Sequence, residues 1–233
     1  MSARGALRGL IFSSMLAATA SAVAASFGLS PTGLSIGLKE QSGSVVVTNT
    51  GTDEVAIQVR PYAWSQDGEE HRAETRDLLV NPPIFKLAAG EQQLVRVASR
   101  LAPLRDVERA YRVVFSEILP QATAKSGFRI TVAMDIPVFV EPLQAAAPII
   151  TWRRQSGNLV AENGGGTHFR LRDVRFLDGN QVVHAVPRIV VLARSRLQIE
   201  LPDGVKKVPG LRLIGQDDAD QSVSIDVPVA PAQ

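Results

Sequence analysis

Apolar and polar residues alternate along most of the chain from Phe27 onward, in short runs that turn residues separate. A period of two places successive side chains on opposite faces of an extended strand. Many short runs of this kind at close spacing are typical of an all-β sandwich. No stretch carries a convincing helical period, so we predict an all-β fold.

The first half of the pattern predicts a series of strands that ends in one long strand. Pro31 and two glycines interrupt the first strand, which indicates an edge strand or one that switches sheets. The pair Asp67-Gly68 predicts a turn in which glycine takes a positive φ. Residues 119–126 connect the last two strands, so we expect these to be antiparallel neighbours. The expected strands cover residues 29–38, 43–50, 55–64, 78–80, 85–87, 93–98, 109–118 and 127–142.

The long strand at 127–142 carries an apolar row on one face. Phe128, Ile130, Val132 and Met134 alternate with more polar residues, and the run spans about 13 residues against about 5–6 for an average strand. The strand could be the last core strand of a sandwich. It could also lend its apolar row to another protein, and periodicity alone leaves both interpretations open.

A stretch of small residues at 143–148 predicts a linker between two domains. The second half repeats the β pattern with shorter strands and no expected helix. Asn163-Gly164 and Asp178-Gly179 predict hairpin turns. The expected strands cover residues 149–154, 159–163, 169–177, 182–186, 189–192, 197–201, 211–214 and 223–227. The domains are therefore expected at 25–142 and 149–233.

The first 24 residues have the pattern of a secretory signal peptide. Arg4 and Arg8 form a basic start, residues 9–20 are apolar or small, and Ala22-Val23-Ala24 is an A-x-A cleavage site. The apolar run is too short to span a bilayer. We therefore expect export and a mature chain that begins at Ala25.

Composition narrows the function classes. Removing the two arginines of the signal leaves 23 basic and 23 acidic side chains, which gives no reason to expect binding to nucleic acid or insertion into a membrane. The chain has no cysteine, so neither disulfides nor thiolate metal sites are available. Stability must come from apolar cores, and the length suffices for two domains of about 100 residues.

Several sequence features have part of the pattern of a phosphate, zinc or sugar site, but lack the rest of it. The run 163–166, Asn-Gly-Gly-Gly, lacks the strand, helix and Lys-Ser/Thr pair of a phosphate loop, which favours a flexible hairpin turn. His71, His168 and His184 lie in separate contexts, which disfavours a zinc site. We expect both Trp64 and Trp152 to pack in a core or against the linker, rather than to form a sugar-binding platform. We expect no catalytic residue, no metal and no cofactor.

A set of residues spread from Phe27 onward resembles the periplasmic pilus chaperones of the PapD-like family, and is most similar to the archaic, Csu-type branch. The likeness is denser in the first half. The residues that carry it are Pro31, Val47-Thr48-Asn49, Gln58-Val59, Trp64, Asp67-Gly68, Asp77-Leu78-Leu79-Val80, Asn81-Pro82-Pro83, Phe85, Gly90, Gln93, Val95-Arg96-Val97, Glu108, Tyr111-Arg112, Glu117-Ile118 and Ile136-Pro137-Val138-Phe139.

The resemblance implies two immunoglobulin-like sandwiches joined at an angle, with a cleft between them. It implies a periplasmic chaperone that is not an enzyme. Such a chaperone donates a strand to pilus or coat subunits that lack one, and delivers them to an outer-membrane usher. The residues that the resemblance assigns to subunit binding through the donor strand are Phe128, Ile130, Val132 and Met134.

The resemblance does not extend to the family's basic anchors. The arginine and lysine that hold a subunit's carboxylate fall at Gly33 and Pro137. A buried carboxylate still needs a charged or multiply hydrogen-bonded partner, and Arg112 is our candidate anchor, expected opposite residues 134–136. The family's interdomain salt bridge pairs a glutamate at Glu108 with an arginine whose position here is Glu141.

Two other function classes remain as alternatives. A β-sandwich module outside the cytoplasm could bind a carbohydrate or another surface ligand, but such a module displays several aromatic residues and this chain has only eight Phe, two Trp and two Tyr. A hydrolase would need a catalytic triad or paired carboxylates. No G-x-S-x-G motif occurs, so this alternative is the weakest.

Overall fold

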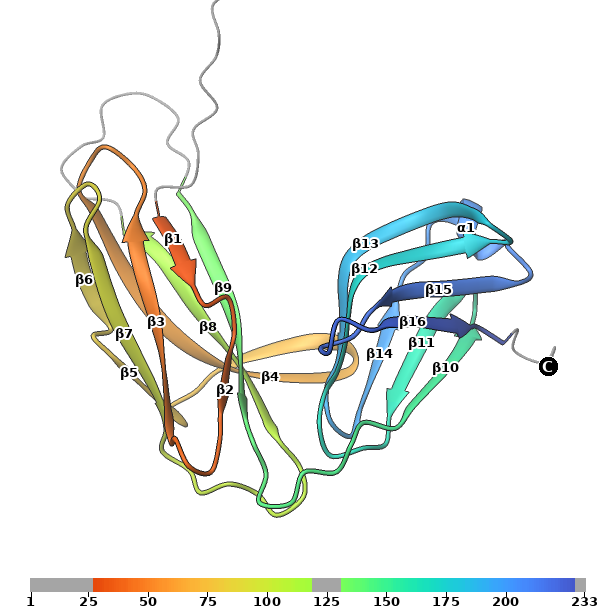
Figure 1. Cartoon of the computed structure of the whole chain (residues 1–233), viewed down its shortest axis with the longest axis horizontal. Helices are drawn as coiled ribbons and strands as arrows, with labels where there is room; N and C mark the ends of the chain where they lie inside the picture. Colours follow the sequence, from red (N-terminus) through yellow and green to blue (C-terminus); the bar gives the residue numbers. More distant parts are fainter. Residues whose placement is uncertain (1–26, 119–130, 229–233) are drawn as a thin grey trace, which may run out of the picture.

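The structure, a computed structural model, describes residues 27–118 and 131–228. The expected signal peptide and the residues Phe128 and Ile130 therefore lie outside the described residues. Two β-sandwiches stand at an angle to each other (Figure 1). Within the described ranges, no helix is long and apolar enough to cross a membrane.

The first sandwich contains the strands of residues 27–140. One sheet has the order β1-β3-β7-β5, and the facing sheet includes β4, β8, β9 and β2, with β6 beside β4. The strands are β1 (Phe27–Ser30), β2 (Leu34–Ile36), β3 (Ser42–Asn49), β4 (Val55–Glu74), β5 (Leu78–Asn81), β6 (Ile84–Leu87), β7 (Gln92–Ser99), β8 (Arg109–Ile118) and β9 (Ala133–Val140).

The core of this sandwich follows from the alternation in sequence. Val45 and Val47 on β3 face Ile57 on β4 and Phe115 on β8, and all four side chains are fully buried. The first expected strand is split at Pro31. Its halves β1 and β2 lie in different sheets, which confirms the prediction of a strand that switches sheets.

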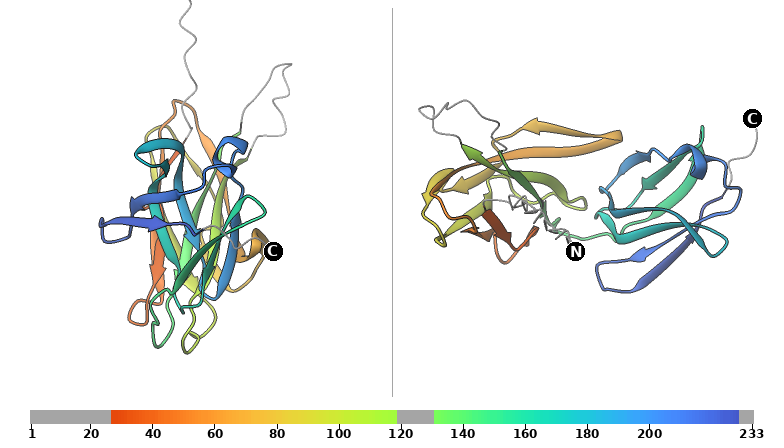
Figure 2. Two further views of the ribbon diagram at one scale, coloured as in Figure 1. Left: turned by 90° about the vertical axis from the view of Figure 1, so that its right-hand side faces the viewer. Right: turned by 90° about the horizontal axis from the view of Figure 1, so that it is seen from above.

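Strand β4 extends ten residues beyond the expected 55–64. It runs toward the second sandwich and doubles back (Figures 1 and 2). Gly68 has φ +84°, which confirms the expected turn glycine. The segment is extended because its tip pairs in parallel with a strand of the second sandwich, Asp67 opposite Arg196 and Gly68 opposite Leu197. That partner lies 129 residues away, so the local sequence could not reveal it.

The second sandwich packs β10, β11 and β14 against a sheet of order β13-β12-β15-β16. Leu159, Leu171, Phe176 and Leu213 fill its core. The elements are β10 (Ile150–Gln155), β11 (Asn158–Asn163), β12 (Phe169–Asp178), β13 (Gln181–Val191), β14 (Ser195–Ile199), α1 (Asp203–Lys206), β15 (Leu211–Gln216) and β16 (Ser222–Asp226).

Two predictions for this sandwich were wrong in detail. The strands expected at 182–186 and 189–192 form the single strand β13, because β13 is an edge strand and Pro187 is tolerated there. One helical turn, α1, occurs where none was expected. The Asp178-Gly179 turn between β12 and β13 is confirmed, with Gly179 at φ +56°.

The Asn163-Gly164-Gly165-Gly166 loop is not the expected hairpin turn. It carries the chain from β11 to β12, which belong to different sheets. It also packs against the segment that joins the two sandwiches: Gly164 N–H donates to the Ile149 carbonyl at 2.9 Å, and Glu108 N–H of the first sandwich donates to the Gly166 carbonyl at 2.9 Å. Gly165 and Gly166 allow a close approach of backbones, because an added Cβ at either position would clash with a backbone carbonyl oxygen.

Candidate functional site

Strand β9 has one partly open edge. Along one side it pairs antiparallel with β8 from Ala133 to Val140, which confirms the expected neighbours. On its other side β2 covers only Val138–Val140, in parallel. Among the described residues, Ala133–Pro137 therefore pairs on one side alone. An open edge of this kind is a template for adding a strand from another protein.

The apolar row of β9 changes its burial along the strand. Ile136, Val138 and Val140 are buried in the first core, whereas Met134 and Val132 pack against that core while partly exposed. The row thus leaves the core toward the N-terminal end of β9. The structure thus shows a gradient of burial along the row, and the donor role of the row stays a prediction.

The opposite face of the same sheet faces the second sandwich and carries Arg112. Arg112 pairs with Pro137 on β9 and with Tyr62 on β4, and Gly33 lies against Pro137 on the far side. The expected register, with Arg112 opposite 134–136, was wrong by at least one residue. The two anchor positions and Arg112 therefore occupy neighbouring places on one face of the sheet.

Arg112 is a buried cation whose hydrogen bonds are incomplete. It is 4% exposed, its guanidinium lies 3.7 Å from the ring centroid of Trp64, and its Nε has no hydrogen-bond partner. The nearest carboxylate oxygen of Asp135 is 3.9 Å away. Burial lowers the pKa of Arg112, Asp135 and Glu70 oppose that shift, and the nearby Arg188 and Arg72 add to it.

A cavity of 280 Å³ lies beside Arg112 between the two sandwiches. The remaining lining residues are Glu70, Arg72, Val186, Arg188, Ile189, Val190, Leu197 and Ile199. Three arginines and one glutamate thus line a space with an aliphatic far wall. Arginine pairs with carboxylates more strongly when both are shielded from water, so this cavity suits an anionic group.

An aromatic wall joins the sandwiches next to Arg112. Trp64 and Phe139 have ring centroids 6.1 Å apart, and Phe139 stacks on His168 of the second sandwich at 3.6 Å and 5°. Trp64 belongs to an interdomain cluster that includes Val190 and Leu192, while Trp152 lies in the second core. The prediction that both tryptophans pack against other residues is confirmed, Trp152 in a core and Trp64 between the sandwiches.

The interdomain contact of Glu108 has a different partner from the one the family pattern suggested. The His168 Nδ1 atom lies 2.9 and 3.0 Å from the two carboxylate oxygens of Glu108, and its backbone N–H donates to Oε1 at 2.6 Å. Glu141 instead accepts a hydrogen bond from Ser35 at 2.7 Å. His168 was missed as an interdomain residue because no local signal marks it.

A second cavity, of 430 Å³, lies where the open edge of β9 ends. It is lined on the first sandwich by Pro31, Thr32, Gly33, Leu34, Ser35, Pro137 and Phe139, and on the second by His168, Arg170 and Asp218. It contains the two positions of the family's anchors. Here the basic side chains come from the second sandwich, a feature that the sequence alone could not show.

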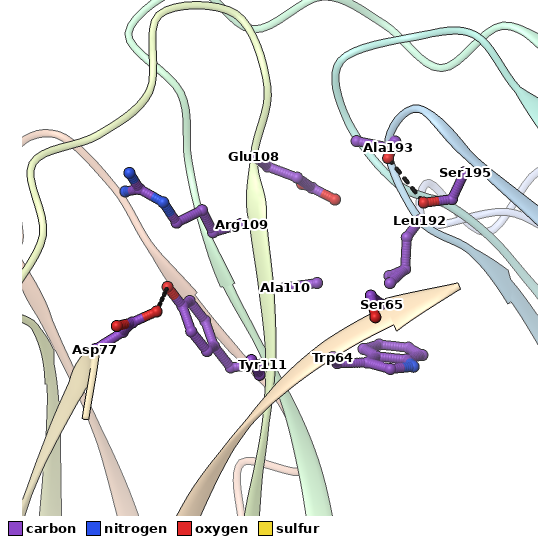
Figure 3. A pocket seen from close by; sticks show the side chains of 11 residues that line it. Trp64, Ser65, Asp77, Glu108, Arg109, Ala110, Tyr111, Leu192, Ala193 and Ser195 are labelled. Atoms are coloured by element: carbon purple, nitrogen blue, oxygen red, sulfur yellow. Dashed lines mark hydrogen bonds between the residues drawn. The ribbon is translucent and has the colours of Figure 1, made fainter. Parts of the chain in front are cut away.

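A third cavity, of 290 Å³, lies between β4 and β8 of the first sandwich and residues 192–195 of the second (Figure 3). Tyr111 donates a hydrogen bond to Asp77 at 3.2 Å, and burial together with Asp77 raises the pKa of Tyr111 to about 12. The Ser195 hydroxyl donates to the carbonyl of Ala193. No histidine lines this cavity, and the described residues contain no group of three or more potential metal ligands.

Residues 26–146 match the family of pili and flagellar-assembly chaperones, PapD N-terminal domain. No curated protein sequence matches significantly. Among solved structures, the CsuC–CsuE chaperone–tip adhesion subunit pre-assembly complex from archaic chaperone-usher Csu pili of Acinetobacter baumannii is similar, with a TM-score of 0.66, 21% identity and coverage of 89% of this chain and 100% of the other.

Two further structures show the same likeness in fold. The SafB chaperone complex with the SafA pilin of Salmonella enterica gives a TM-score of 0.67 at 14% identity, covering 89% of this chain and 99% of the other. The E. coli chaperone DraB gives 0.62 at 16% identity, covering 88% and 96%. These likenesses establish the fold of two immunoglobulin-like domains expected from the sequence.

Proposed function

Because the chain belongs to the PapD-type family of pili and flagellar-assembly chaperones, we propose that it binds pilus or coat subunits in the periplasm and delivers them to an outer-membrane usher. The secretory pattern of residues 1–24 supports export, with a mature chain from Ala25. The proposed domains are 25–142 and 149–233, joined by 143–148. The function is binding and transfer, without catalysis.

The open edge of β9 is the observation that carries this proposal. A subunit that lacks one strand exposes an apolar groove and unpaired backbone groups, and both need a strand from outside. From Ala133 to Pro137, β9 offers backbone groups that no described strand pairs on one side. The two sandwiches leave room at the end of this edge, in the cavity that contains Pro137.

We propose Phe128, Ile130, Val132 and Met134 as the side chains that fill the subunit's groove. The partial exposure of Val132 and Met134 supports this assignment. Full burial of an apolar side chain of this size contributes about 1.5–3 kcal/mol. Phe128, Ile130 and Val132 together would contribute roughly 5–9 kcal/mol before the costs of ordering are subtracted.

Arg112 is proposed as an anchor for the subunit's terminal carboxylate on the first domain. It neighbours Pro137 across the strand pair, and its buried Nε lacks a partner. A hydrogen bond to a charged group contributes about 1.5–3 kcal/mol. The departure from the family pattern at Gly33 and Pro137, together with the likeness to the CsuC complex, leads us to propose membership of the archaic branch.

The test uses Ile130→Asp, with Thr131→Asp as a matched control on the other face of the segment. Each variant is coexpressed with a candidate pilus or coat subunit, a small secreted β-protein from the same genome. We expect Ile130→Asp to lose the partner, because an unpaired carboxylate in an apolar groove costs several kcal/mol. Thr131 is exposed, so Thr131→Asp should retain the partner.

A thermal melt of each free variant separates strand donation from a core role. A donor residue is partly exposed in the free protein, so Ile130→Asp should change the unfolding free energy by only about 0.5 kcal/mol. A large fall in the melting temperature of free Ile130→Asp would reject donation at this position. Arg112→Ala tests the anchor in the same assay, and an undiminished partner yield would reject that assignment.

A further inference from the structure

The cavity at the end of the open edge already contains a carboxylate, that of Asp218. Arg170 Nε donates to Asp218 Oδ1 at 2.5 Å, and both side chains line this cavity opposite Gly33 and Pro137. His168 Nε2 lies 3.9 Å from the other Asp218 oxygen. An arginine in this position faces the place where a subunit's chain end would arrive.

A strand added in the direction of β2 would present its C-terminal end to this cavity. β2 lies parallel to β9 and begins at Leu34, opposite Val138. A subunit strand that pairs with Ala133–Pro137 on the same side of β9 as β2, and in the same direction, would end where β2 begins, at the Gly33 side of the cavity. A parallel strand presents its C-terminal end there, and a free carboxylate matches a guanidinium in charge and geometry.

The turn that carries Asp218 does not need this ion pair for its own structure. Asp217 accepts hydrogen bonds from the backbone N–H groups of Ala219 and Gln221, both at 2.9 Å. Asp220 pairs with Arg172 on β12. Asp217 and Asp220 therefore hold the turn between β15 and β16, while Asp218 reaches away from it to Arg170.

The ion pair is also accessible to a competitor. The side chains of Arg170 and Asp218 are 34% and 46% exposed. Partly exposed ion pairs contribute little to stability, because water and salt screen them and both side chains lose conformational freedom. A carboxylate that arrives on a paired strand competes at high effective concentration, so it can replace Asp218 without a large loss.

We propose that Asp218 is an internal stand-in for the subunit's terminal carboxylate, and that it occupies Arg170 until a subunit displaces it. Arg170 is then a second anchor, supplied by the second domain, in addition to Arg112, which lines a different cavity on the first. This inference rests on the proposed function. It adds an autoinhibitory contact: the free chaperone neutralises its own anchor, which lowers its affinity for other anionic chain ends.

The test measures binding of a synthetic peptide to the full mature chaperone by calorimetry. The peptide carries the last strand of the candidate subunit used for coexpression, once with a free carboxylate and once as the C-terminal amide. Asp218→Asn removes the competing charge at constant size, and Asp220→Asn is the matched control in the same turn. Arg170→Gln removes the anchor.

We expect Asp218→Asn to tighten binding of the acid peptide roughly tenfold, the equivalent of one charge-assisted hydrogen bond. Binding of the amide should not change, and Asp220→Asn should behave as wild type. Arg170→Gln should weaken the acid peptide and abolish the gain from Asp218→Asn in the double variant.

Unchanged or weaker binding of the acid peptide by Asp218→Asn would overturn the inference, whatever its effect on the melting temperature. An equal gain for the amide would do the same, because the competition would then not concern a carboxylate. Failure of the proposed function has a separate signature: neither peptide form would bind to wild type, and wild type would recover no subunit on coexpression.

Discussion

Substituting Gly165 by alanine should destabilise the packing of the segment that joins the domains against the second domain. A Cβ atom at this position would lie 2.2 Å from the Ala147 carbonyl oxygen and 2.6 Å from the Pro148 Cα. Both are backbone atoms of the segment that joins the domains, so no side-chain rotation can relieve the clash. The backbone must move by about 1 Å, since nonbonded carbon atoms prefer separations of about 3.5–4.0 Å.

The same loop supplies a matched control. At Gly164 the nearest atom to an added Cβ is the Ile149 carbonyl oxygen at 4.0 Å. Neither glycine has a φ in the left-handed region, so the difference between the two alanine variants reports space alone. Alanine at Gly164 should be neutral, or stabilising by about 0.4–1 kcal/mol through the unfolded chain.

Overpacking in a tightly packed region costs about 1–3 kcal/mol. The upper part of this range applies at Gly165, because the clash is with backbone. For a chain of 150–250 residues, 1 kcal/mol corresponds to about 2–4 °C in melting temperature, so we expect a fall of about 4–12 °C for Gly165→Ala. Differential scanning calorimetry of both variants is the assay, and equal melting temperatures would refute the reasoning.

Two further predictions concern buried polar groups. The Gln66 side chain donates a hydrogen bond to the Val190 carbonyl and accepts one from the Leu192 N–H, each at 2.9 Å. Gln66→Leu should therefore lower the unfolding free energy, measured by urea denaturation, by about 2–4 kcal/mol. The same change at exposed Gln92 should stay within about 0.5 kcal/mol, and equal costs would contradict the interdomain role. The raised pKa of Tyr111, about 12, means that the folded state holds the phenol proton more tightly than the unfolded state. The unfolding free energy should therefore fall by about 2–3 kcal/mol between pH 10 and 12. Tyr111→Phe should lose this pH-dependent fall, so parallel pH profiles of the two proteins would contradict the prediction.

Strands whose apolar faces meet their own domain's core were predictable from the sequence. The expected 109–118 strand is β8, and 43–50 overlaps β3, because alternation over eight to ten residues fixes both the extended backbone and the buried face. Gly68 and Gly179 were predictable for a local reason too, since each turn needs a positive φ that glycine adopts without strain.

The features that could not be predicted depend on contacts between distant residues. The end of β4 is extended because β14 pairs with it. Gly165 is explained by the joining segment that packs on it, and Gly166 by the backbone of Asp106. His168 gains its role from Glu108, 60 residues earlier. Local periodicity contains none of this information.

The candidate site was predictable only in part. The sequence indicated Arg112 as a cleft residue, but the register of β8 and β9 placed it opposite Pro137 rather than 134–136. The basic groups nearest Gly33 come from β12 and the residue before it, in the other domain. A search restricted to the first domain could not find Arg170, because only the angle between the domains brings it there.

The pairing of β4 with β14 makes one sheet continuous through both domains, in the order β10-β11-β14-β4-β8-β9-β2. Backbone hydrogen bonds form whatever the side chains are, so this junction between the domains can tolerate substitutions of its surface residues. Glu141 bonds to Ser35 and Glu108 contacts His168, so the angle between the domains does not require an ion pair between Glu108 and residue 141. The side chains of the cleft would then be free to adapt to new subunits while the backbone preserved the shape that presents them.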